Sequence, residues 1–188
     1  MQKIAQFEKV SFEQFIKDWI DCFPFYNKDN IKKIYDNIKL PQRATSGSAG
    51  YDFYCPMTYC LNKSGEASNS FGDSTYYTGI IKFPTGIRCK IEDGWALNIY
   101  PRSGQGFKYG LRLANTVGVI DSDYYNSDNE GHIFVKFLND SCIQKDILFS
   151  EGQAFCQGIF TPYGVTYDDN INKIRNGGFG STNNPGNL

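Results

Sequence analysis

The chain has 188 residues, and its 19 basic and 20 acidic side chains leave a formal net charge of −1. Its length suits one domain with its own core, and a near-neutral charge provides no overall field that would recruit nucleic acid or an anionic membrane. Because no stretch approaches the ~20 apolar residues of a membrane span and the start MQKIAQFEKV lacks the apolar core of a secretory signal, we expect an intracellular, cytoplasmic protein.

The six cysteines and the single histidine limit the chemistry further. The cysteines form no CxxC pair, and one histidine gives little support to a zinc cluster, so we expect reduced, structural thiols. A Ser-His-Asp or Cys-His mechanism would depend on His132 alone. This residue follows Gly131 in a predicted loop or strand start, where we expect a surface or edge side chain.

Two amphipathic helices are predicted at the start of the chain. From Ser11 to Phe23, apolar residues recur at three- and four-residue spacing, and Ser11 with Gln14 matches a capping box. The spacing recurs over residues 30–40, and a proline then stops it. We interpret residues 1–41 as a helical extension that packs against the domain or a neighbouring subunit, with binding of a protein partner as the alternative.

The pattern then changes to short, strand-like runs separated by glycine, asparagine, serine and aspartate. The runs are GIIKFPTGIRCKI, GWALNIYP, GVIDSDY, GHIFVKFLN and FCQGIFTPYGVTY. They predict a mainly β domain, a sandwich or barrel, over residues 42–170. Polar residues 62–75 and 126–130 predict two solvated loops, and residues 171–188 form a glycine-rich tail.

A candidate phosphate site lies in residues 101–124, PRSGQGFKYGLRLANTVGVIDSDY. An arginine can bind phosphate oxygens in a bidentate manner, while a serine hydroxyl and backbone N–H groups beside a glycine add donors. A carboxylate held nearby can activate a water molecule. We therefore predict phosphate chemistry in which Arg102, Ser103 and Gly104 bind the phosphates and Asp121 acts as the base.

This run resembles the second and third motifs of the trimeric dUTP diphosphatases (dUTPases). ATSGSAGYDF (44–53) resembles the first motif, EGQAFCQ (151–157) the fourth, and RNGGFGST (175–182) the glycine-rich fifth. The motifs stand in the family's order and cover most of the chain from Ala44 onward. The resemblance implies a jelly-roll-like subunit, a homotrimer, and Mg2+-dependent hydrolysis of dUTP to dUMP and pyrophosphate.

The resemblance also implies a role for each candidate residue. Asp121 holds the water that attacks the α-phosphorus. Phosphate binding is assigned to Arg102, Ser103, Gly104, Gln157, Arg175, Ser181 and Thr182, and binding of uracil and deoxyribose to Asn115, Val119, Ile120, Tyr124 and Phe179. Tyr124 stacks under the sugar and leaves no room for a 2′-hydroxyl group. No protein group ligates Mg2+ directly, and Asp52 either orients its waters or caps the turn after Gly50.

In the family each active site is shared by three subunits, with the lid formed by the fifth motif. Two alternatives remain beside hydrolysis of dUTP. A dCTP deaminase shares the fold and the phosphate clamp, but its catalytic glutamate corresponds to Lys136, which cannot relay protons as a carboxylate does. A nucleotide-sensing regulatory protein would use the N-terminal helices or the inserted loops to contact a partner.

Overall fold

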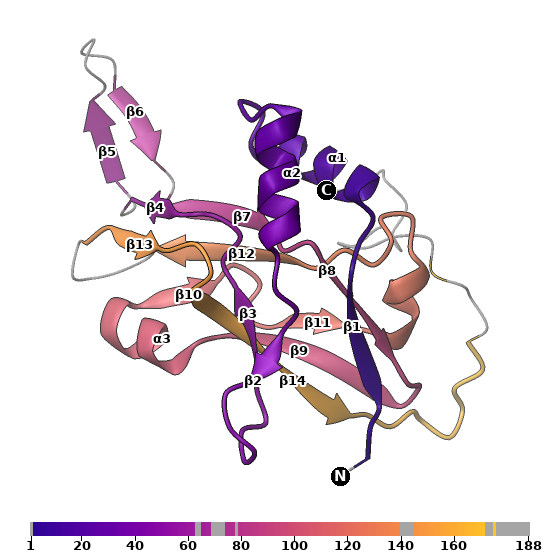
Figure 1. Ribbon diagram of the computed structural model, residues 1–188. Helices are drawn as coiled ribbons and strands as arrows, with labels where there is room; N and C mark the ends of the chain where they lie inside the picture. The colour runs from indigo at the N-terminus through magenta and orange to yellow at the C-terminus, as the bar shows by residue number, and fades with distance from the viewer. Residues whose placement is uncertain are drawn as a thin grey trace.

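The computed structural model describes residues 2–62, 65–68, 74–77, 79–139, 145–171 and 175, with backbone alone for 65–68 and 74–77. Strands predominate in this part of the chain, which confirms the predicted mainly β fold (Figure 1). In chain order the elements are β1 (Ala5–Lys9), α1 (Phe12–Cys22), α2 (Lys28–Asn37), β2 (Gln42–Arg43), β3 (Tyr51–Tyr54), β4 (Tyr59–Leu61), β5 (Gly65–Ser68), β6 (Ser74–Tyr77), β7 (Ile80–Pro84), β8 (Ile87–Ile91), β9 (Trp95–Pro101), α3 (Ser103–Tyr109), β10 (Leu111–Leu113), β11 (Gly118–Ile120), the 3-10 helix η1 (Ser122–Asn126), β12 (Phe134–Asn139), β13 (Ile147–Phe149) and β14 (Ala154–Pro162).

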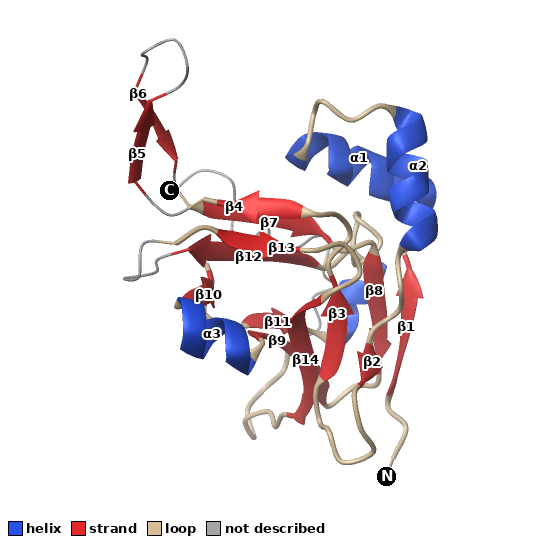
Figure 2. Cartoon of the chain, turned by 60° about the vertical axis from the view of Figure 1, so that its left-hand side comes forward, coloured by secondary structure: helices blue, strands red, loops and turns tan. Residues whose placement is uncertain are grey.

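The largest described sheet has the order β11-β9-β14-β3-β2, and all of its pairings are antiparallel. A second sheet, β10-β12-β7, lies across the core from it, as Figure 2 shows. Aromatic rings join the layers: Phe83 of β7 and Phe137 of β12 each lie 5.6 Å, centroid to centroid, from Phe155 of β14. Alternate residues of β12 are buried, as expected for a strand that covers a core on one face.

The N-terminal helices pack on this same core (Figures 1 and 2). Helix α1 buries Phe15 and Trp19 completely, and α2 does the same with Ile31. The second helix begins two residues before its predicted start because the side chain of Asn27 caps it, accepting a hydrogen bond from the Asn30 amide at 2.9 Å. The apolar faces that predicted the helices are therefore the faces that the fold buries.

Several local predictions need correction. Only helices were predicted before residue 41, but strand β1 precedes them and pairs with β8, with Phe7 opposite Cys89. The capping box is half formed: Ser11 Oγ accepts the Gln14 amide at 3.1 Å, but the Ser11 amide donates to Glu130 instead of Gln14. Part of the segment 62–75, predicted as a loop, is strand: residues 65–68 form β5, and residues 74–75 begin β6, which pairs antiparallel with β5.

The prediction that His132 lies at the surface or an edge was wrong. Its side chain is completely buried, because two long-range partners satisfy both ring nitrogens. The Gly86 amide donates to Nε2 at 2.7 Å, and Asp18 Oδ2 from α1 lies 2.6 Å from Nδ1. With Nε2 acting as acceptor, the proton of the neutral ring is on Nδ1 and is donated to Asp18.

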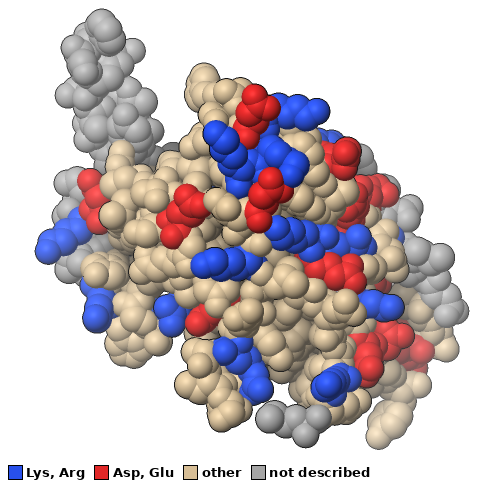
Figure 3. All heavy atoms as spheres, viewed as in Figure 1, with Lys and Arg blue, Asp and Glu red and all other residues tan. Residues whose placement is uncertain are grey.

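Surface charge and cysteine chemistry agree with the composition. Basic and acidic side chains intermix over the face that Figure 3 shows. Helices long and apolar enough to cross a membrane are absent from the described residues. The described cysteines are free thiols, and burial raises the pKa of Cys55 and of Cys89 to about 12, so both stay protonated at neutral pH. Cys142 lies outside the described residues.

Candidate active site

Arg102, Asp52 and Gln157 come together at one end of the large sheet. Gln157 of β14 stands opposite Asp52 of β3 on one side and Tyr100 of β9 on the other. Arg102 Nε lies 3.2 Å from Asp52 Oδ1, and Gln157 Nε2 donates to the Pro101 carbonyl at 3.2 Å. The ion pair with Asp52, whose side chain is only 16% exposed, fixes the direction of the guanidinium group.

Gly50 lies close against this cluster. A Cβ atom added to Gly50 would stand 2.5 Å from Gln157 Oε1, so a larger residue would displace the Gln157 side chain. The first and fourth sequence motifs are thereby packed against each other. The predicted alternative for Asp52, a cap on the turn after Gly50, is not what its carboxylate does here, since it pairs with Arg102.

The cluster continues into helix α3, which begins directly after Arg102. The Arg102 carbonyl accepts the amides of Gln105 and Gly106, so the amides of Ser103 and Gly104 are left without partners inside the helix. Both residues are exposed, as is the Arg102 side chain. Guanidinium, hydroxyl and amide donors therefore face solvent together, which is an arrangement suited to phosphate oxygens. This group is called the phosphate cluster below.

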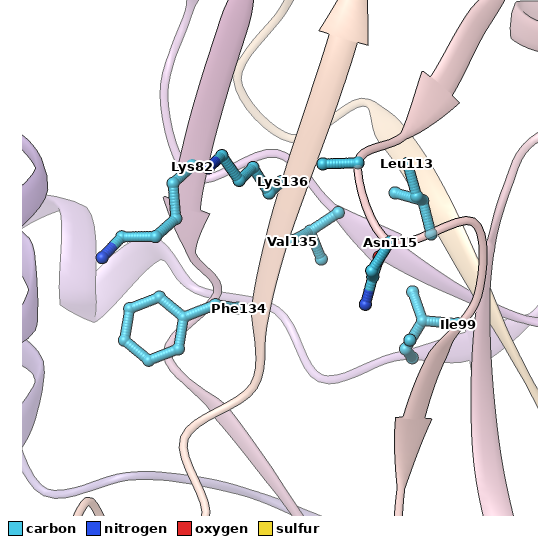
Figure 4. A pocket seen from close by; sticks show the side chains of 9 residues that line it. Lys82, Ile99, Leu113, Asn115, Phe134, Val135 and Lys136 are labelled. Atoms are coloured by element: carbon cyan, nitrogen blue, oxygen red, sulfur yellow. The ribbon is translucent and has the colours of Figure 1, made fainter. Parts of the chain in front are cut away.

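A pocket of about 360 Å³ lies between β12 and the segment that joins β10 to β11 (Figure 4). Its wall is mostly apolar, with Asn115 as an uncharged polar side chain, and the complete lining is Lys82, Ile99, Leu113, Ala114, Asn115, Gly118, Phe134, Val135 and Lys136. A Cβ at Gly118 would lie 3.3 Å from Ile99 Cβ and narrow the pocket. An apolar wall with one amide suits a small heterocyclic ring. This cavity is called the base pocket below, after the heterocyclic base that it could hold.

Two lysines of the base pocket stand directly opposite each other, Lys82 on β7 and Lys136 on β12. Lys82 donates to Asp21 at 3.1 Å, and its ammonium lies 5.1 Å from the centre of the Phe134 ring. Within the described part of the chain, the Lys136 ammonium has no ion-pair partner. Like charges facing each other across a ladder are unfavourable, so an acceptor on a ligand would stabilise this position. From the sequence alone, Lys136 indicated only that deamination is disfavoured.

Val119 and Ile120 lead from the base pocket to Asp121. Val119 is 57% exposed, whereas Ile120 is half-buried against the core. The Asp121 side chain forms no capping hydrogen bond to η1, so it does not serve as a turn cap. Instead Arg175 Nη2 donates to Asp121 Oδ2 at 2.5 Å, and Arg175 Nε lies 3.0 Å from Asp123 Oδ1.

Tyr124 lies beside the Arg175 guanidinium, with its hydroxyl group directed into the fold. The residue is 5% exposed; its hydroxyl donates to the His132 carbonyl at 2.8 Å and accepts from Asn129 Nδ2 at 2.8 Å. Burial raises the pKa of the phenol, which therefore stays neutral. The Arg175 guanidinium lies 5.9 Å from the ring centre, and the hydroxyl, engaged inside the fold, is not available to a ligand. Stacking under a sugar stays a prediction.

The fifth motif is represented only by Arg175, because Phe179, Ser181 and Thr182 lie outside the described residues. Arg175 contacts carboxylates of its own chain. Its predicted approach to a γ-phosphate is untested, as are the predicted lid contacts. Asp123, which the sequence analysis did not single out, shares Arg175 with Asp121; its place two residues after the candidate base is the signal that could have indicated it.

Strand β9 separates the phosphate cluster from Asp121. In the β9–β11 ladder Ile120 stands opposite Leu97, so Asp121 lies near the start of β9, whereas Arg102 follows its end. From position 96 to position 102 the strand advances six residues, or about 20 Å at ~3.3 Å per residue. The α-, β- and γ-phosphates of a nucleotide lie within a few bond lengths of each other. Arg102 and Asp121 of one chain are therefore too far apart to act on the same triphosphate.

The described residues contain no group of three or more His, Cys, Asp or Glu side chains that could hold a metal ion. A cage made by the protein is therefore not present among them. The donors of the phosphate cluster can bind phosphate oxygens, and Asp52 supplies a nearby carboxylate for a water on a Mg2+ ion that such phosphates would carry.

Comparisons with known proteins agree with this geometry. A family model described as dUTPase matches residues 36–183. The deoxyuridine 5'-triphosphate nucleotidohydrolase of Lactococcus lactis subsp. lactis is 40% identical over 149 residues, covering 77% of this chain and 88% of that protein. Its counterpart in Escherichia coli K12 is 35% identical over 154 residues, covering 79% and 89%.

Solved structures show the same fold. The dUTPase of Streptococcus mutans matches with a TM-score of 0.57 at 27% identity and covers 85% of this chain and 97% of that one. A dUTPase from phage phi11 of S. aureus matches with a TM-score of 0.56 over 91% and 98% of the two chains; at 16% identity it supports the fold alone. That phage structure details the coordination of a structural Mg(II) ion.

Proposed function

The chain belongs to the dUTPase family, and from this premise we propose that it hydrolyses dUTP to dUMP and pyrophosphate. One observation carries the proposal beyond the family match: Asn115 and Gly118 form the wall of the base pocket, and β11 leads from there directly to Asp121. A base held in the pocket therefore brings its own α-phosphate toward the carboxylate.

Asp121 acts as the general base in this proposal. Arg175 occupies Oδ2, which leaves Oδ1 to accept a hydrogen bond from the attacking water. The water oxygen bonds to the α-phosphorus, its proton passes to Asp121, and the bond from the α-phosphorus to the α–β bridging oxygen breaks. Pyrophosphate leaves with that oxygen and with the electron pair of the broken bond.

Substrate recognition is divided between the two ends of the site. Asn115 pairs with the pyrimidine edge inside the base pocket, and the Tyr124 ring stacks under deoxyribose so that a 2′-hydroxyl finds no room. Arg102, Ser103, Gly104 and Gln157 bind the phosphates. Mg2+, when bound, neutralises charge on the phosphates; Asp52 then orients water at the metal while it holds Arg102.

We also propose a homotrimer in which neighbouring subunits complete each active site. The separation of about 20 Å along β9 supports this, because the phosphate cluster of one subunit must serve the Asp121 of another. A mixing experiment tests it with two inactive variants, Arg102→Ala and Asp121→Asn. In reassembled 1:1 mixtures about one quarter of the sites should combine an intact Arg102 with an intact Asp121. A mixture as inactive as its parents would contradict the shared site.

The activity itself is tested by measuring pyrophosphate release from dUTP, UTP, dCTP and dTTP with Mg2+, beside an ammonia assay on dCTP. Cleavage of dUTP in strong preference to the other three is the expected result. Ammonia from dCTP would instead favour the deaminase alternative. Absence of both activities in a folded oligomer would favour a nucleotide-sensing role.

A further inference from the structure

The first 35 residues lie outside the part of the chain that the dUTPase family model matches. Their side chains nevertheless bond to the segment that follows Asp121, which contains η1 and the turn before β12. The contacts are Glu8 Oε2 accepting from the Tyr125 hydroxyl at 2.7 Å, Ser11 Oγ donating to Glu130 Oε1 at 2.6 Å, and Asp18 Oδ2 pairing with His132 Nδ1 at 2.6 Å.

The Asp18 contact leads directly to Tyr124. Gln14 Nε2 donates to Asp18 Oδ2 at 2.7 Å, which fixes the carboxylate on α1. Asp18 and the Gly86 amide then hold the two sides of the His132 ring. The carbonyl of this same histidine accepts the Tyr124 hydroxyl at 2.8 Å. Hydrogen bonds through His132 thus join helix α1 to Tyr124, whose ring is predicted to lie under the sugar. The His132 side chain in this connection is wholly buried.

The other two contacts hold the segment that follows Tyr124. Glu130 accepts both the amide and the hydroxyl of Ser11, so the turn also caps helix α1. Arg88 donates to the Tyr125 carbonyl at 2.9 Å, and its guanidinium lies 3.6 Å from the centre of the Tyr125 ring. The segment that follows Tyr124 is therefore tied to β1 through Glu8, to the start of α1 through Ser11 and to β8 through Arg88.

We propose that Asp18 is a positioning residue for substrate selection: through His132 it holds the Tyr124 ring where deoxyribose fits and ribose does not. The N-terminal segment thereby takes part in catalysis without touching the substrate. The inference rests on the proposed function, in which Tyr124 selects the sugar. Two roles were considered for residues 1–41, packing against the domain and binding of a protein partner. The inference gives the packing a function in substrate selection, and it does not require a protein partner.

The test compares Asp18→Ala with Asp36→Ala as a control. Asp36 lies on α2, where its exposed carboxylate pairs with Lys32 of the same helix. The readout is the ratio of kcat/KM for dUTP to kcat/KM for UTP. Loss of folded protein lowers both rate constants equally, so the ratio reports only the geometry of the site. We expect the ratio to fall about tenfold in Asp18→Ala, since small misplacements of a positioning group are costly, and to stay unchanged in Asp36→Ala.

Two further variants separate the possible outcomes. Asp18→Asn keeps an acceptor for His132 Nδ1 and should restore most of the ratio. Tyr124→Ala should abolish the selection; if it does not, the proposed role of Tyr124 is wrong and the failure belongs to the proposed function. If Tyr124→Ala lowers the ratio but Asp18→Ala leaves it at the wild-type value, the inference about Asp18 is overturned.

Discussion

Mild acid should destabilise the folded protein through one residue, His132. Burial lowers the pKa of this imidazole below its usual 6.5, and this effect outweighs the opposing effect of Asp18. The unfolded chain therefore takes up a proton near pH 6.5 that the folded chain does not, so the stabilisation is complete above pH 6.5 and is lost as the pH falls below it. At pH 5.5 the loss amounts to about 1.4 kcal/mol if the folded ring stays neutral.

The sequence makes this prediction easy to measure, because His132 is its only histidine. Burial raises the pKa of Glu130, which faces the same region, but its hydrogen bonds from Ser11 help to outweigh this effect and the pKa is lowered, away from this window. Urea unfolding at a fixed protein concentration at pH 7.5 and 5.5 gives the difference directly. A His132→Gln variant, although less stable, should lack the step between these pH values. Equal stability of the wild-type protein at both, or greater stability at pH 5.5, would refute the reasoning.

Three substitutions test other parts of the structure. Asp121→Asn should preserve nucleotide binding while kcat falls about 10²- to 10⁴-fold, because an amide cannot accept the proton; near-normal turnover would exclude Asp121 as the base. Gly131→Ala should lower the free energy of unfolding by about 2 to 4 kcal/mol, since Gly131 has φ +69° and a Cβ would stand 2.7 Å from Tyr125 Cα. Gly164→Ala, where a Cβ meets nothing within 4 Å, is its control in the same urea titration, and equal losses would contradict the steric argument. Lys136→Met should lower the preference for dUTP over dCTP about tenfold, because a donor-only cation favours a base carbonyl over an exocyclic amine; an unchanged preference, as expected for the exposed Lys33→Met, would remove Lys136 from base recognition.

Much of the fold follows from local sequence patterns. The three- and four-residue spacing of Phe15 and Trp19 predicts the buried face of α1, and Asn27 explains where α2 begins. The strand-like runs correspond to β7–β9, β11, β12 and β14. Such patterns can be read because each depends on neighbours within one or two turns or along one strand.

The candidate residues were also identified from the sequence, since motifs preserve spacing along the chain. Asp52, Arg102 and Gln157 are far apart in sequence, and only the pairing of β3, β14 and β9 brings them into one cluster. The sequence could not indicate that β9 would separate Asp121 from Arg102, because this distance depends on which strand pairs with which. This separation along β9 is the observation that supports the proposed trimer with shared sites.

The histidine shows where sequence reasoning ends. By itself, His132 beside Gly131 is a polar residue in a turn, and exposure is the reasonable expectation. Its burial depends on Asp18, 114 positions earlier, and on the Gly86 amide. The sequence alone determined the elements, the motif residues and the family resemblance, because these are local in the chain. Only the tertiary structure decided that Asp18 is connected to Tyr124 through His132 and that Arg175 pairs with Asp121. A polar side chain can be buried only where distant parts of the chain supply its hydrogen-bond partners.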